Sequence, residues 1–139
     1  MPKSFTEHLS RSVTHFALGA PSGRSTWMPN TDVYESADQW IVKMELAGLD
    51  KENLEVTLHG RLLVVCGCRE DTCRQRQRRC SFRQMEIDYG FFERRLVIPH
   101  AVDTKRVRAA LHNGFLRVEL PKAARADHTT LAILIERLD

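Results

Sequence analysis

Short stretches in which apolar and polar residues alternate fill the middle of the chain. Apolar residues occupy every second position over 54–59 and 107–111, and again over 42–46. A period of two is typical of strands that bury one face. Further strands are predicted at 32–35, 62–66, 91–98 and 115–120. Asn113-Gly114 is a strong hairpin signal between two of these runs. The spacing predicts an all-β fold, an antiparallel immunoglobulin-like β-sandwich over 29–121.

Residues 1–28 follow a different pattern and form a separate N-terminal arm. Ser4 and Glu7 have capping-box spacing. Four apolar residues then share one helical face: Phe5, Leu9, Val13 and Phe16. Such a helix is too short to be stable alone in water, so its apolar face needs a partner. It either packs on its own domain or serves as an adhesive arm for assembly and for binding other proteins.

Residues 122–139 form a C-terminal tail, with a polar linker followed by Leu131-Ala132-Ile133-Leu134-Ile135. In one extended strand Ile133 and Ile135 point the same way, about 6.6–7 Å apart. Two such side chains can enter an apolar slot at a sandwich edge while the backbone adds hydrogen bonds. Burying both contributes roughly 3–6 kcal/mol before the linker's ordering cost. The tail is expected to bind another subunit, and the alternative is that it docks on its own domain as one more strand.

A long charged insertion, 69–90, separates two predicted strands, and loops of this length are usually functional or disordered. Between Arg69 and Arg83 six arginines face only Glu70 and Asp71. The loop could meet an acidic partner surface, bind nucleic acid or stay solvated. The near absence of interleaved aromatic residues argues against nucleic acid.

Composition and motifs narrow the function classes. The chain of 139 residues suits one domain, and its net charge of +3 is too small to indicate nucleic acid. No apolar run is long enough for a membrane helix, and residues 1–20 lack a signal-peptide pattern, so we expect a cytoplasmic protein without a membrane partner. The absence of a phosphate-binding loop, a serine elbow and a histidine cluster predicts no enzyme, catalytic residue or cofactor.

The spacing of the four cysteines bears on whether the chain binds a metal ion. Their spacing differs from the paired spacing of structural zinc sites, so no metal is expected, and the residues are Cys66, Cys68, Cys73 and Cys80. Ordinary reduced thiols are the simplest interpretation. The alternatives are zinc binding, and redox sensing or disulfides between subunits.

Four stretches resemble the small heat-shock proteins, whose core is the α-crystallin domain. The stretch 108–122, RAALHNGFLRVELPK, is similar to the family's A-x-x-x-N-G-V-L box, with Phe115 in place of valine. The stretch 90–99, GFFERRLVIP, is similar to its G-x-F-x-R strand, with Leu96 where an aromatic is common. At 40–58 the family's P-G turn keeps only Gly48, because Ala47 replaces the proline. The tail tripeptide Ile133-x-Ile135 matches the family's tail motif.

The resemblance implies an ATP-independent holdase chaperone that keeps unfolding proteins from aggregating and works as a homo-oligomer built from dimers. The insertion resembles the dimerisation loop of bacterial and plant members, in which Phe82–Glu86 would join the partner's Asp32–Glu35, and Arg94 would lie at that interface. As an alternative, Arg94 is an ordinary exposed strand residue. A monomeric co-chaperone module and a nucleic-acid-binding protein are the competing functions.

The expected site residues form four groups. Ile133 and Ile135 are the oligomerisation residues of the tail. The tail-accepting groove comprises Leu54, Val56, Leu58, Val107, Ala109 and Leu111. The dimer interface comprises Asp32, Val33, Tyr34, Phe82, Met85, Glu86 and Arg94. The client-binding residues are Phe5, Leu9, Val13 and Phe16.

Overall fold

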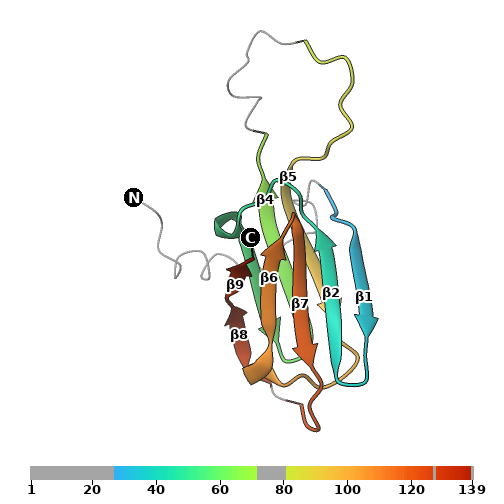
Figure 1. Ribbon diagram of the computed structural model, residues 1–139, viewed down its shortest axis with the longest axis vertical. Coiled ribbons are helices and arrows are strands. Elements are labelled where there is room, and N and C mark those ends of the chain that lie inside the picture. The colour runs from blue at the N-terminus through green and yellow to red at the C-terminus, as the bar shows by residue number, and fades with distance from the viewer. Residues whose placement is uncertain (1–26, 72–80, 127, 139) are drawn as a thin grey trace.

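Two β-sheets packed face to face make up the domain in the computed structural model, which describes residues 27–71, 81–126 and 128–138 (Figure 1). One sheet has the order β1 (Thr31–Glu35), β2 (Gln39–Glu45), β7 (Phe115–Pro121), β6 (Arg108–His112) and β9 (Ile135–Arg137). The other has the order β5 (Gly90–Val97), β4 (Leu62–Arg69), β3 (Leu54–His59) and β8 (Thr130–Ile133). The short 3₁₀ turns are η2 (Lys51–Asn53) and η3 (Thr104–Arg106). The predicted all-β sandwich is confirmed.

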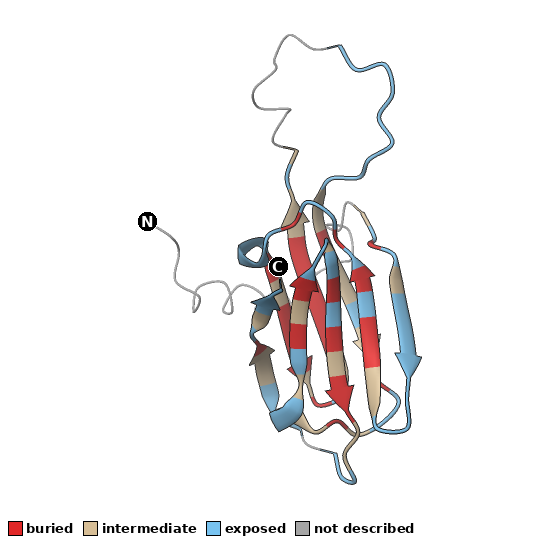
Figure 2. Cartoon of the chain, viewed as in Figure 1, coloured by how far each residue is buried: buried red, intermediate tan, exposed pale blue. Residues whose placement is uncertain are grey.

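The core lies between the two sheets and is built from the alternating residues that the sequence indicated. Val42, Met44 and Leu46 face Leu54, Val56 and Leu58 from the opposite sheet, and all six are buried. Figure 2 shows this as buried positions alternating with exposed ones along β2 and β7. One face of each central strand is thus withdrawn from water, which is the main favourable contribution to folding.

The predicted hairpin at Asn113-Gly114 joins β6 to β7. Asn113 has φ 50° and Gly114 φ 78°, so both central residues have the positive φ that a type I′ turn requires. The Leu46 N–H donates to the Gly114 carbonyl at 2.7 Å. A Cβ at Gly114 would lie 3.0 Å from the Ala47 Cα. The turn therefore packs directly against the end of β2.

The tail is divided between the two sheets, which corrects the expectation of one continuous strand. β8 pairs antiparallel with β3, whereas β9 pairs parallel with β6. The chain crosses from one sheet to the other at Leu134, which is 77% exposed. In this single chain the tail is docked on its own domain, as the alternative interpretation held, although as two short strands and not one.

The described part of the insertion before β5, residues 81–89, extends beyond one end of the sandwich (Figure 1). Residues 81–89 contain no strand in this single chain. β1 and β5 are the strands at the matching free edges of the two sheets, so each keeps one side unpaired among the described residues.

Candidate assembly site

The tail fills a groove between β3 and β6, where the sandwich would otherwise be open. Ile133 lies opposite Val56, and Ile135 lies opposite Ala109. Ile133 is only 8% exposed and belongs to the core, and Ile135 packs against the core. Both isoleucines therefore point into the space between the sheets.

The residues expected to form the groove lie on both sides of the tail. Leu54, Val56 and Leu58 are buried on β3. Ala109 and Leu111 are buried on β6, and Val107 is half-buried just before that strand. The Ala109 side chain is a single methyl group, so the larger Ile135 can approach β6 at this position.

Hydrogen bonds fix both ends of the tail. At its start the Gly60 N–H donates to the Thr129 carbonyl at 3.3 Å, and His59 Nδ1 lies 2.8 Å from the Thr130 hydroxyl. At its end the Leu138 N–H donates to the Leu111 carbonyl at 3.0 Å. The tail is therefore held by main-chain pairing as well as by the two isoleucines.

His112 binds the end of the tail through one tautomer of its imidazole ring. Asn113 Nδ2 lies 3.0 Å from His112 Nε2 and donates to it, so the ring proton is on Nδ1. Nδ1 then donates to the Leu138 carbonyl. The same Asn-Gly hairpin that turns the chain thus also secures the tail.

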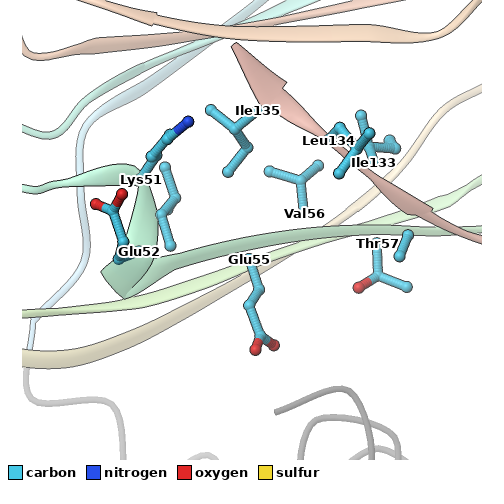
Figure 3. A pocket seen from close by; sticks show the side chains of 10 residues that line it. Lys51, Glu52, Glu55, Val56, Thr57, Ile133, Leu134 and Ile135 are labelled. Carbon is cyan, nitrogen blue, oxygen red and sulfur yellow. The ribbon is translucent and has the colours of Figure 1, made fainter. Parts of the chain in front are cut away.

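A pocket of about 190 Å³ remains beside the tail, next to η2. Figure 3 shows Val56, Ile133 and Ile135 on one side of β3 and Glu55 pointing away on the other. Lys51 and Glu52 form the polar wall of the pocket. The groove is thus not completely filled where the tail crosses between the sheets.

The residues expected at the dimer interface lie on two exposed segments that do not meet within one chain. Asp32, Val33 and Tyr34 are exposed on the edge strand β1, and Arg117 Nη1 donates to the Tyr34 hydroxyl at 3.1 Å. Phe82 and Met85 are each more than half exposed in the loop. Glu86 is also exposed there and accepts a hydrogen bond from Gln84 Nε2 at 2.7 Å.

Arg94 lies on β5 opposite Val65, so its side chain leaves the strand on the core-facing side. It is half-buried at the free edge of its sheet. Its neighbours Glu93 and Arg95 form an ion pair of 3.5 Å on the other face.

The four residues expected to bind clients (Phe5, Leu9, Val13 and Phe16) lie outside the described residues.

Trp27 and Arg69 form an anchor that the sequence did not reveal. The Arg69 guanidinium lies 4.0 Å from the centre of the Trp27 ring and donates from Nη1 to the Ala47 carbonyl at 3.1 Å. The Trp27 Nε1–H donates to the Gly90 carbonyl at 2.8 Å, and its ring meets Phe92 edge-on at 5.2 Å. Arg69 is thus bound at the base of the loop, whereas the sequence grouped it with the loop's positive charge.

The two described cysteines, Cys66 and Cys68, lie on β4 as reduced thiols. The Cys66 thiol donates to Glu55 Oε2 at 3.8 Å. Burial, and secondarily the charge of Glu70, raise the pKa of the Cys68 thiol, which favours the less reactive protonated form.

No group of three or more metal-ligating side chains is found among the residues that the structure describes. In those same ranges no helix has the length and apolarity to span a bilayer.

Comparison with known proteins identifies the domain. The model of the Hsp20/alpha crystallin family matches residues 32–136, from β1 to β9. The chain belongs to this family. The small heat-shock proteins are non-enzymatic chaperones, so the expectation that the protein is no enzyme follows from membership.

Small heat-shock relatives occur in bacteria and fungi. Spore protein SP21 of Stigmatella aurantiaca is 38% identical over 72% of this chain and 58% of its own length. Heat shock protein 16 of Schizosaccharomyces pombe is 32% identical over 70% of this chain and 68% of its own. The chain spans between 56% and 60% of the length of the first three curated relatives it matches.

Solved small heat-shock protein structures share the fold. Heat shock protein 16.0 from Schizosaccharomyces pombe superimposes with a TM-score of 0.66 at 31% identity, over 79% of this chain and 99% of that one. A small heat-shock protein from Xylella fastidiosa, described as having a distinct high order structure, gives 0.64 at 27% identity, over 74% and 93%.

Proposed function

We propose that this small heat-shock protein is an ATP-independent holdase that binds unfolding proteins and prevents their aggregation. The observation that carries the proposal is the family match across the whole sandwich and both tail strands. A cytoplasmic location belongs to the same proposal, because the reduced cysteines Cys66 and Cys68 suit a reducing compartment.

The working form is proposed to be a homo-oligomer in which the tail of one chain fills the groove of another. The groove accepts the tail through strand pairing and two isoleucines, and a neighbour's tail would make the same contacts. Moving the tail from its own groove to that of another chain therefore changes the contact energy little. The length of the linker after β7 decides which groove the tail can reach. Ile133, Ile135 and the six groove residues are assigned to this contact.

The building block is proposed to be a dimer formed through the loop. Phe82 and Met85 are exposed apolar residues on an extended segment, and β1 presents an unpaired edge with Val33 and Tyr34 exposed. Unpaired edges readily accept a strand from another chain. The half-buried Arg94 lies at the free edge of the facing sheet, where its guanidinium could pair with a partner's carboxylate.

Client binding is assigned to the apolar face of the arm: Phe5, Leu9, Val13 and Phe16. This rests on the helical spacing of these residues and on the need of a short amphipathic helix for an apolar partner.

Aggregation of a heat-labile enzyme, followed by light scattering without ATP, tests the holdase proposal. The chain is expected to suppress aggregation when it is nearly equimolar with the enzyme, and adding ATP should not increase the suppression. Scattering that stays unchanged at every ratio would contradict the function. Native mass measured on the same sample separates this proposal from a co-chaperone module, which would be monomeric.

The assembly role is tested by Ile133→Ala combined with Ile135→Ala. Losing the buried Ile133 and the half-buried Ile135 side chains removes most of the apolar contact, so the native mass is expected to fall toward that of the dimer. Leu134→Ala is the matched control, because Leu134 lies between the two isoleucines but is 77% exposed. An unchanged mass for the double variant would refute the assignment.

A further inference from the structure

The tail stays bound beyond its second isoleucine. β9 pairs with β6 as far as Arg137, which lies opposite Leu111. The Leu138 N–H then donates to the Leu111 carbonyl at 3.0 Å, and the Leu138 carbonyl accepts a hydrogen bond from His112 Nδ1. The Leu138 side chain is 51% exposed. The last contact of the tail is therefore made mainly by main-chain atoms.

The His112 side chain supplies a donor at the point where its strand ends. β6 ends at His112, because the chain turns back at Asn113 with φ 50°. A parallel ladder needs main-chain donors from a strand that runs on, and the turn interrupts this series. The Leu138 carbonyl can only accept, so His112 Nδ1 has to be the donor. The imidazole thus extends the pairing by one residue.

The hairpin holds this donor in a fixed position. The Gly114 carbonyl accepts from the Leu46 N–H at 2.7 Å, and a Cβ at Gly114 would lie 3.0 Å from the Ala47 Cα. Asn113 Nδ2 lies 3.0 Å from His112 Nε2 and keeps the proton of the ring on Nδ1. A donor that is positioned before binding loses less conformational entropy when the tail arrives.

We propose that His112 and Asn113 form a carbonyl clip that determines which tails the groove accepts. The preferred ligand is an extended Ile-x-Ile peptide that continues for three further residues, and the third of these is recognised through its main chain, whatever its side chain. This proposal rests on the proposed assembly and deepens it. A tail that stops at the second isoleucine lacks the carbonyl, so the groove favours copies of this chain over chains with shorter tails.

Hydrogen exchange of the amides of residues 136–138, measured in the full chain, tests the clip. The amide nitrogen of asparagine is as many bonds from Cβ as Nδ1 of histidine, whereas that of glutamine corresponds to Nε2. His112→Gln is expected to accelerate the exchange about fivefold, equivalent to about 1 kcal/mol. His112→Asn should restore the donor and change it by less than about twofold. Leu138→Ala is the control, because it keeps the carbonyl.

Asn113→Gly separates the clip from the turn. Glycine adopts positive φ readily, so the hairpin is kept while the donor to His112 Nε2 is removed. Exchange at 136–138 is expected to accelerate about threefold, the size of one modest hydrogen bond. The amides of β6 and β7 should stay protected. Unchanged exchange at 136–138 would show that Asn113 has no part in holding the tail.

Selection by tail length is tested with two labelled, amidated peptides, residues 129–138 and residues 129–135. The host is the full chain carrying Ile133→Ala and Ile135→Ala, which loosen its own tail. The longer peptide is expected to bind about tenfold more tightly, and in a host that also carries His112→Gln the ratio should fall to about twofold.

The proposal has clear contrary outcomes. Equal exchange in His112→Asn and His112→Gln, whether fast or slow, overturns it, because the position of the donor would then be irrelevant. Equal affinity of the two peptides overturns the selection by length. If neither peptide binds but the exchange pattern is as expected, the clip is supported within one chain, and only the transfer of tails between chains in the proposed function is contradicted.

Discussion

Gly67 shows how tightly the end of the sandwich is packed around one residue. A Cβ at this position would lie 2.7 Å from the Asn53 carbonyl oxygen and 3.0 Å from the Phe92 ring. Both neighbours are fixed, since Asn53 belongs to η2 and Phe92 is fully buried. The glycine allows the ring and the turn to approach the same point of β4.

We therefore expect Gly67→Ala to lower the free energy of unfolding by about 1–3 kcal/mol, because an added methyl group overpacks the site. Urea unfolding followed by circular dichroism measures the change. Cys68→Ala, at the next and more exposed position of β4, is the control and should change stability much less. Equal stabilities for the two variants would show that the contact around Gly67 relaxes freely.

At the level of elements, the Trp27–Arg69 anchor connects the arm, the loop and the turn that follows β2. Arg69 contributes a stacking face to Trp27 and hydrogen bonds to the carbonyls of Ala47 and Asp88. Lysine keeps the charge but offers neither the planar face nor the paired donors. The anchor is thus specific for arginine.

Arg69→Lys is expected to weaken the anchor by about 1–2 kcal/mol, the range of a partly desolvated cation–π contact. Hydrogen exchange of the amides of residues 27–30 and 88–90 should accelerate, while the centres of β3 and β7 stay protected. Arg83→Lys, in the exposed part of the same loop, serves as the control. Exchange that is alike in the two variants would count against the anchor.

The central strands were predictable because each buries one face, and this gives the sequence a period of two. The alternation of the residues assigned to the groove was predictable on the same ground, whereas their grouping into a groove came from the family resemblance. The division of the tail was not, because Leu131, Ile133 and Ile135 alternate identically in one strand or two. Which sheet each half joins depends on the positions of Val56 and Ala109 in space. The Trp27–Arg69 contact joins residues far apart in the sequence and leaves no local pattern.

On the scale of the whole molecule, the exposed loop is expected to decide whether two chains associate. Phe82→Asp combined with Met85→Asp removes two exposed apolar residues and adds charge, so the dimer is expected to dissociate to monomers at micromolar concentration. Native mass spectrometry measures the distribution. Gln75→Asp combined with Gln77→Asp adds the same charge in the same loop, outside residues 82–86, and should leave dimers intact. Dimers that persist in the first variant would place the interface elsewhere.

The crossing of the tail at Leu134, with one tail and one groove in each chain, also implies a stoichiometry for the proposed assembly. Once a tail leaves its own groove, each chain has one tail to donate and one groove to be filled. The tail and the groove lie at different places on its surface. Such a contact is head-to-tail. Every groove is filled only in a closed ring or cage, since an open row leaves one unbound tail and one empty groove at its ends. Assemblies of this protein are therefore expected to be closed, with the angle imposed by linker 122–129 selecting their size.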